Sequence, residues 1–250
     1  MTTGDARNTM REFLTARPIA HRGLHDAAAG VIENTTSAFQ AAVAGNYGIE
    51  CDLQISADGE AMVYHDDALG RLTEGAARLD TMTAAALKTV AFKSTRDRML
   101  GLGELCDLVA GRVTLVIELK GNFDGDDRLA QRTTQVLASY RGPAALMSFD
   151  PGLIASVRKL APTLVRGLVG MRRQPDAPAA RMTPSAYARA ALAARPNFLA
   201  YRVADLSMPL PLFARHVLRL PLLTWTVRTF AERVRASRYA DQMIFEGFRP

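Results

Sequence analysis

Cysteines and long apolar runs are scarce in this sequence. Only Cys51 and Cys106 occur, without the spacing of a zinc site, which fits a reducing compartment better than a disulfide-stapled secreted fold. The opening segment, MTTGDARNTMREFLTARPIA, lacks the apolar run of a signal peptide, and nowhere do about 18 apolar residues run together. These absences predict a soluble, cytoplasmic protein without stable membrane insertion.

Lysine is rare as well. The chain has 31 basic residues and a formal charge of +6, but lysine stands only at Lys88, Lys93, Lys120 and Lys159. A positive balance would suit a phosphate-bearing substrate or an acidic surface, although a general preference for arginine and alanine is the simpler explanation. No basic block with interleaved aromatics and no zinc-finger or helix-turn-helix spacing occurs, so nucleic acid is not a predicted partner.

The sequence does have the composition and the pattern of an α/β domain. Hydrophobic residues make up 48% and charged residues 22% of its 250 residues, a length common for one α/β barrel. No repeat or composition shift divides the chain, so one domain over residues 1–250 is predicted. Residues 66–112 are too many for a simple connection, and we expect a small helical insertion there.

Short apolar runs alternate with helix-like stretches, as in repeated βα units around a parallel sheet. Eight strands are predicted, enough to close a barrel: Pro18–His21, Gly48–Ile55, Val113–Leu119, Ala145–Phe149, Leu164–Val169, Phe198–Tyr201, Leu222–Val227 and Met243–Glu246. The helices expected between them include Thr35–Ala44, Arg128–Ser139, Pro151–Leu160, Pro184–Ala194 and Phe230–Ala236.

Glu50 and Asp52 stand two residues apart on the second predicted strand. Side chains at this spacing leave the same face of a strand. Two carboxylates that point together repel each other unless a cation or a proton lies between them, and such oxygen ligands favour Mg²⁺, Ca²⁺ or Mn²⁺. The spacing therefore predicts one divalent cation at this strand.

The same strand runs into Asp58-Gly59, the pair preferred in a two-residue hairpin turn. With such a turn Ala57 pairs with Glu60, and counting back places His65 opposite Asp52. Cross-strand partners have Cβ atoms about 4.5–5.5 Å apart, so a histidine is predicted beside the cation. A slip of one residue would move every side chain to the other face.

Two further strand ends carry polar pairs. Glu118 and Lys120 share a face and would supply a third metal ligand and a phosphate anchor; a surface ion pair is the alternative. His21 and Arg22 end the first strand, before a glycine that permits a sharp turn, and a purely structural histidine is the alternative there. Together these groups suit phosphodiester hydrolysis, because a cation with two basic side chains neutralises phosphoryl oxygens while two imidazoles exchange protons.

The sequence resembles the glycerophosphodiester phosphodiesterase family. The matching pieces follow the family's order along nearly the whole chain: HRG at His21–Gly23, ENTTSAF at Glu33–Phe39, GIECDLQISADGE with VYHD through Asp66, RLT at Arg71–Thr73, IELK at Ile117–Lys120, SF at Ser148–Phe149 and WTV at Trp225–Val227. The resemblance implies a TIM-type (β/α)₈ barrel. It also implies hydrolysis of a glycerophosphodiester to glycerol 3-phosphate and an alcohol such as choline or ethanolamine.

The resemblance also implies roles for single residues. His21 and His65 would be the acid/base pair, Glu50, Asp52 and Glu118 the metal ligands, and Arg22 and Lys120 the phosphate contacts. Which histidine is the base stays open, as does the source of the attacking oxygen, a water or a neighbouring substrate hydroxyl that would give a cyclic intermediate.

Three other residues are candidates near the site. Glu33 and Asn34 could help to position it, with Glu33 as a substrate contact, although Asn34 would equally serve as the N-cap of the following helix. Trp225 could cover the substrate or simply pack in the barrel.

Two stretches depart from the family's usual pattern. The family commonly continues W-x-V with asparagine and closes on I-x-T-D-x-P, whereas this chain has Arg228 and then Ile244-Phe-Glu-Gly-Phe-Arg-Pro250. Neither stretch belongs to the metal set. Because both lie near strand ends, where barrel sites form, the expected effect is on the glycerol or headgroup pocket.

Two alternative functions stay open. A phospholipase D-like lipid hydrolase, similar to the sphingomyelin-cleaving toxins, would use the same groups on the same barrel. A non-catalytic protein that binds a phosphorylated ligand would usually have lost a metal ligand or a catalytic base, and none is missing. The predicted partner is a small glycerophosphodiester, and the oligomeric state is not predicted.

Overall fold

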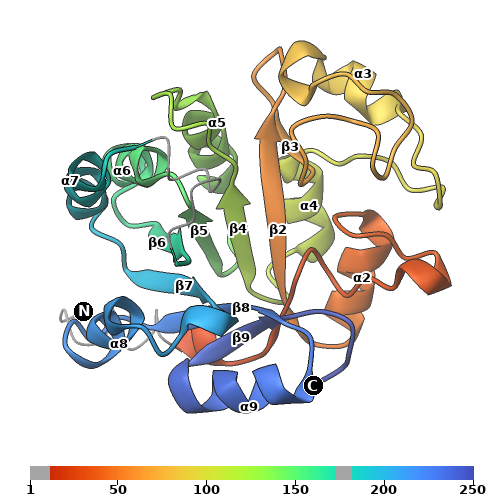
Figure 1. Cartoon of the computed structure of the whole chain (residues 1–250). Helices are drawn as coiled ribbons and strands as arrows, with labels where there is room; N and C mark the ends of the chain where they lie inside the picture. The colour runs from red at the N-terminus through yellow and green to blue at the C-terminus, as the bar shows by residue number, and fades with distance from the viewer. Residues whose placement is uncertain (1–11, 173–181) are drawn as a thin grey trace.

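The protein folds as a closed barrel of eight parallel strands surrounded by helices, as a computed structural model that describes residues 12–172 and 182–250 shows (Figure 1). The strands follow one another around the barrel in chain order, and β1 pairs with both β2 and β9, which closes it. A ninth strand, β3, is antiparallel to β2 and lies outside the ring. The parallel strands are β1 (Ile19–Ala20), β2 (Gly48–Ile55), β4 (Leu115–Leu119), β5 (Ala144–Ser148), β6 (Val165–Gly170), β7 (Phe198–Arg202), β8 (Leu222–Val227) and β9 (Gln242–Phe245). The predicted TIM-type fold and its eight strands are confirmed.

Helices connect the strands and cover the outside of the barrel (Figure 1). They are α2 (Thr36–Ala44), α3 (Ala84–Thr89), α4 (Leu102–Val109), α5 (Arg128–Leu137), α6 (Pro151–Leu160), α7 (Pro184–Ala194), α8 (Pro209–His216) and α9 (Phe230–Tyr239), with short 3₁₀ turns η1 (Ala27–Ala29), η2 (Leu79–Thr81) and η4 (Val203–Asp205). All five helices named from the sequence are present. Helix α6 begins as its sequence suggests, because Asp150 accepts a hydrogen bond from the backbone N–H of Gly152 and Pro151 needs no such partner.

Alternation along the strands separates two apolar clusters. Outward-facing residues such as Ile49, Cys51 and Ile117 pack against the helices, while Val116 and Met147 belong to a second cluster inside the barrel. The inner positions become charged toward the carboxyl ends of β2 and β4. The polar site therefore lies above the apolar cluster inside the barrel, at the end of the barrel where (β/α)₈ proteins form their sites.

The β2–β3 hairpin differs from the sequence prediction by one residue. Its loop has three residues, 57–59, closed by a hydrogen bond from the Ser56 N–H to the Glu60 carbonyl oxygen, with Gly59 at φ 81°. This is the three-residue hairpin with a left-handed residue, not the two-residue turn. Tyr64, not His65, therefore pairs with Asp52, and the predicted pairing is wrong. His65 lies beyond the end of β3 (Ala61–Val63), where the chain leaves the sheet, so its direction is not set by the strand alternation.

The residues between β3 and β4 form a small substructure beside the barrel (Figure 1). They contain η2, α3 and α4, and two isolated bridges, Ala68 to Arg78 and Thr73 to Phe92, tie their loops together. A separate apolar cluster built around Tyr64, Leu79 and Phe92 lies beneath them. Within the part of the chain that the structure describes, no helix has the length and apolar character needed to cross a bilayer.

Candidate active site

Three carboxylates converge at the carboxyl end of the barrel. Glu50 and Asp52 come from one face of β2, and Glu118 comes from β4, where the parallel register sets it beside Asp52. One oxygen of each lies within 4.8 Å of the others, and the residues are only 1%, 1% and 8% exposed. The structure thus brings together the three predicted metal ligands.

Two basic side chains offset part of this negative charge. The Lys120 Nζ atom is 2.7 Å from both Asp52 Oδ1 and Glu118 Oε1, and Arg22 Nε is 3.2 Å from Asp52 Oδ2. Although burial opposes ionisation, Lys120 and Arg22 hold the pKa of Asp52 below its usual range. Glu50 is in the opposite situation, because burial and the charges of Asp52 and Glu118 raise its pKa well above the ordinary value.

The opposite pKa shifts of Asp52 and Glu50 show whether the site suits a cation. Without one, a buried carboxylate faces two others and its ionisation is suppressed. A divalent ion among the three oxygens would remove that repulsion, and an all-oxygen donor set matches Mg²⁺, Ca²⁺ or Mn²⁺ better than the softer transition metals. The donors and their charge therefore fit one divalent cation.

The turn after β1 is shaped to present its polar groups to these acids. Arg22 has φ 56° and Gly23 has φ 81°, and a Cβ on Gly23 would come within 2.8 Å of Ala38 in α2. The tight turn directs the backbone N–H of Arg22 to Glu50 Oε2, at 2.9 Å. The glycine is required here by both its backbone angle and the close helix.

Asn34 takes the positioning role rather than the capping one. Its Nδ2 donates to Asp52 Oδ2 at 2.9 Å, and its Oδ1 accepts from the Asp52 backbone N–H at 3.3 Å. The N-cap of α2 is instead Thr35. Asn34 thereby fixes both the backbone and the side chain of one acid.

His21 lies at the end of β1 and is buried. Its Nε2 atom is 3.9 Å from Glu50 Oε2, and its Nδ1 atom forms a short hydrogen bond with Glu246, which follows β9. Burial lowers the pKa of His21, and the Glu246 carboxylate opposes that shift. This contact could not be predicted from the sequence, because 225 residues separate the two side chains.

His65 approaches the same centre from the β3 side. Its Nδ1 atom is 2.7 Å from Asp66 Oδ1, and the other oxygen of Asp66 accepts from Arg71 Nε at 2.6 Å. Arg71 also binds Glu33, which in turn binds Arg22 Nη1 at 2.6 Å. Glu33 is thus occupied by two arginines, and this network links the two sides of the site.

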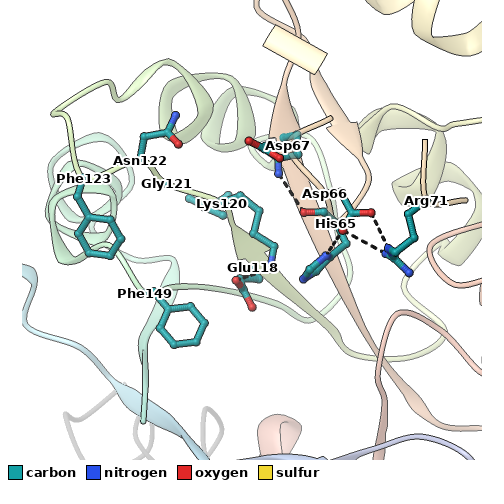
Figure 2. Close-up of a pocket in the computed structure, with 12 residues that line it drawn as sticks. His65, Asp66, Asp67, Arg71, Glu118, Lys120, Gly121, Asn122, Phe123 and Phe149 are labelled. Atoms are coloured by element: carbon teal, nitrogen blue, oxygen red, sulfur yellow. Dashed lines mark hydrogen bonds and ion pairs between the residues drawn. The ribbon is translucent and has the colours of Figure 1, made fainter. Parts of the chain in front are cut away.

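An open pocket lies above the carboxylates. One part, of about 590 Å³, is lined by His65, Glu118 and Lys120, with Phe123 and Phe149 on the side opposite Arg71 (Figure 2). An adjoining part, of about 430 Å³, is lined by both His21 and His65 together with Trp225 and Arg228.

Trp225 both packs and lines this pocket. Its ring meets Phe149 edge to face at 5.5 Å, and its Nε1 donates to the Ala200 carbonyl oxygen at 3.1 Å. These contacts fix the indole as a wall of the pocket next to the two histidines.

The fold and site together define a (β/α)₈ barrel with an acidic, histidine-flanked centre at the carboxyl ends of its strands. The chain belongs to the glycerophosphoryl diester phosphodiesterase family, whose model matches residues 21–245.

Individual relatives agree with this assignment. The chain is 30% identical over 161 residues to a glycerophosphodiester phosphodiesterase of Caldanaerobacter subterraneus. The matched segment covers 60% of this chain and 65% of the relative. It is 28% identical over 185 residues to a probable glycerophosphodiester phosphodiesterase 1 of Mycobacterium tuberculosis, and this match covers 64% of this chain and 66% of the relative. The chain thus spans just under two thirds of these relatives' length. A solved phosphodiesterase structure from Oleispira antarctica matches with a TM-score of 0.76 at 20% identity, over 93% of this chain and 94% of that one, and shows the same fold.

Proposed function

We propose that this protein hydrolyses glycerophosphodiesters to glycerol 3-phosphate and an alcohol with the help of one divalent cation. The observation that carries the proposal is the cluster of three buried carboxylates, one of which, Glu118, reaches the pocket that both histidines line. Membership of the family supports it. The Oleispira antarctica structure contains sn-glycerol-3-phosphate, described as its product.

In this proposal each group has one task. Glu50, Asp52 and Glu118 hold the cation, which when bound neutralises charge on the phosphoryl oxygens. Arg22 and Lys120 add positive charge on either side of the phosphate.

The two histidines handle the protons. His21 and His65 line the same pocket, so one takes the proton of the attacking hydroxyl and the other gives a proton to the leaving alkoxide. In the net reaction one P–O bond to the leaving alcohol breaks and one P–O bond to the oxygen of water forms, so one water is consumed. Glu33 acts on the substrate through Arg22, which it binds, and Trp225 bounds the substrate pocket.

The site is proposed to work in a reducing, cytoplasmic environment. Cys51 and Cys106 are both free and buried, which is the state expected of thiols there.

The test is release of glycerol 3-phosphate from glycerophosphocholine by the purified full chain. We expect activity that is abolished by a chelator and restored by at least one of Mg²⁺, Ca²⁺ and Mn²⁺. Lysolipid micelles form the second arm, and preferential cleavage of them would favour the lipid hydrolase instead. Folded protein that releases no product from any glycerophosphodiester with any of the three ions would refute the proposal.

A further inference from the structure

The two departures from the family's usual pattern lie side by side in the structure. Arg228 follows β8 and Glu246 follows β9, and these neighbouring strands pair through Val227 and Phe245. The Glu246 backbone N–H also donates to the Val227 carbonyl oxygen at 3.1 Å. The register therefore sets the two unusual side chains next to each other at the rim of the pocket.

Both side chains are connected to His21 by hydrogen bonds. Arg228 Nε donates to Glu246 Oε1 at 2.6 Å, and Glu246 Oε2 bonds to His21 Nδ1. The same Oε2 atom is 3.6 Å from Nε2 of His25. A carboxylate oxygen thus meets the catalytic candidate on the side away from the acids.

This arrangement determines which nitrogen of His21 faces the reaction. A carboxylate on Nδ1 requires a proton there, so Nε2 is the nitrogen that points to the acidic centre, 3.9 Å from Glu50. Arg228 holds the carboxylate in place, and its own backbone N–H is held by Glu232 Oε2 at 2.8 Å. His21 and His25 keep the pKa of Glu246 below its usual range although burial alone would raise it, so the carboxylate is ionised.

We infer that Glu246, held by Arg228, is a positioning residue that sets the tautomer and ring orientation of His21, and that the two departures act as one unit. The inference rests on the proposed function for its kinetic consequence. Both positions were expected to affect the substrate pocket, which Arg228 lines, and the structure adds a link from Arg228 through Glu246 to His21.

The kinetic test compares Glu246→Thr, Arg228→Asn and the double variant, which remove the carboxylate, the guanidinium and both. Loss of a carboxylate that orients a metal-binding histidine commonly costs about 10–100-fold, and by analogy we expect a drop of that size in kcat for Glu246→Thr with KM changed less than about twofold. Arg228→Asn should lose less. The double variant should be no worse than Glu246→Thr, because Arg228 has nothing to hold once the carboxylate is gone.

Two further variants separate positioning from general damage. Glu246→Gln keeps an oxygen acceptor for Nδ1–H and should recover part of the lost kcat. Arg215→Asn is the matched control, because Arg215 makes a similar pair with Asp241 just before β9, 3.2 Å apart at the opposite end of that strand. It should leave kcat unchanged.

A spectroscopic readout keeps this inference distinct from the proposed function. Nitrogen-15 shifts of the histidine rings, assigned with His21→Ala, should report the Nδ1–H form of His21 in the unaltered protein and its loss in Glu246→Thr. An unchanged tautomer in the folded variant overturns the inference even if no substrate is ever turned over. So do a kcat within twofold of the unaltered protein, or losses that simply multiply in the double variant.

Discussion

The two histidines of the site are held by the same chemistry but by different parts of the molecule. Each imidazole has its Nδ1 atom on a carboxylate, and each carboxylate is bound by an arginine. For His21 these hydrogen bonds involve Glu246 and Arg228, which follow strands at the other end of the sequence. For His65 they involve Asp66 and Arg71, which lie close to His65 in the sequence.

Their surroundings differ in a way that matters for function. The His21 side chain is 11% exposed and its partner arrives only because the barrel closes between β1 and β9. The His65 side chain is 32% exposed and is supported by a loop outside the barrel. Of the two proposed proton-transfer groups, we infer that His21 is fixed by the barrel, while His65 depends on the smaller substructure and is the more easily displaced.

The largest effect is expected from a change at the proposed cation site, which the two histidines share in the proposed mechanism. Glu118→Gln takes a ligand from the proposed cation site, where a bound ion supplies several kcal/mol of transition-state stabilisation. We expect kcat/KM to fall by about 10³-fold, since each 1.36 kcal/mol is a factor of ten. Steady-state kinetics across a metal titration checks this, and activity that stays both high and chelator-sensitive would show that the ion binds elsewhere.

The next effect compares the histidines directly. His21→Ala and His65→Ala should each lower kcat by about 10²-fold, the lower end of what an acid or base contributes, because each removes one of the two proposed proton-transfer groups. Only His21→Ala should also lower the thermal midpoint clearly, because it removes the hydrogen bond between His21 and the partly buried Glu246, at a cost of about 1–3 kcal/mol. Calorimetry of both variants decides, and equal destabilisation would contradict the difference between the two histidines.

A smaller effect concerns the arginine on the His65 side. Arg71→Ala removes one partner from Asp66 and one from Glu33, so we expect kcat to fall by about tenfold through loss of orientation. Arg78→Ala is the matched control in the same substructure, because Arg78 pairs with Asp67 and Asp80 and does not contact either histidine's carboxylate. If both variants lose activity equally, the network through Arg71 has no specific role.

The smallest effect concerns the anchoring of the hairpin that precedes His65. Arg132 on α5 binds Glu60 at 2.8 Å, and Arg132→Ala should cost about 0.2–1 kcal/mol of stability with little change in kcat. The hydrogen bond from Arg132 lowers the pKa of Glu60, so this contribution is present above the unfolded pKa of about 4.3 and is lost as the pH falls through the folded value.

Denaturant curves at pH 7 and pH 3 measure that difference. Arg128→Ala, on the same helix and paired only with Asp126 among the contacts described, is the control and should change neither curve. A stability loss from Arg132→Ala that is as large at pH 3 as at pH 7 would contradict the ionic explanation.

Much of the fold and of the acidic centre could be predicted from local pattern. The period of two along a strand places Glu50 with Asp52, whichever strand lies next to them. The alternation of apolar runs and helices similarly predicts the barrel strands. The hairpin was the local error, because Asp58-Gly59 suits both a two-residue turn and the three-residue loop that occurs, and one residue changes every cross-strand partner.

The sequence by itself determined which side chains share a strand face, because that depends only on backbone geometry between neighbours. Tertiary structure alone decided that Asn34 would brace Asp52, that Glu118 would lie beside it, and that Glu246 would meet His21. These contacts depend on strand order, register and ring closure. Such features arise from packing the whole chain at once, so no short stretch of residues specifies them.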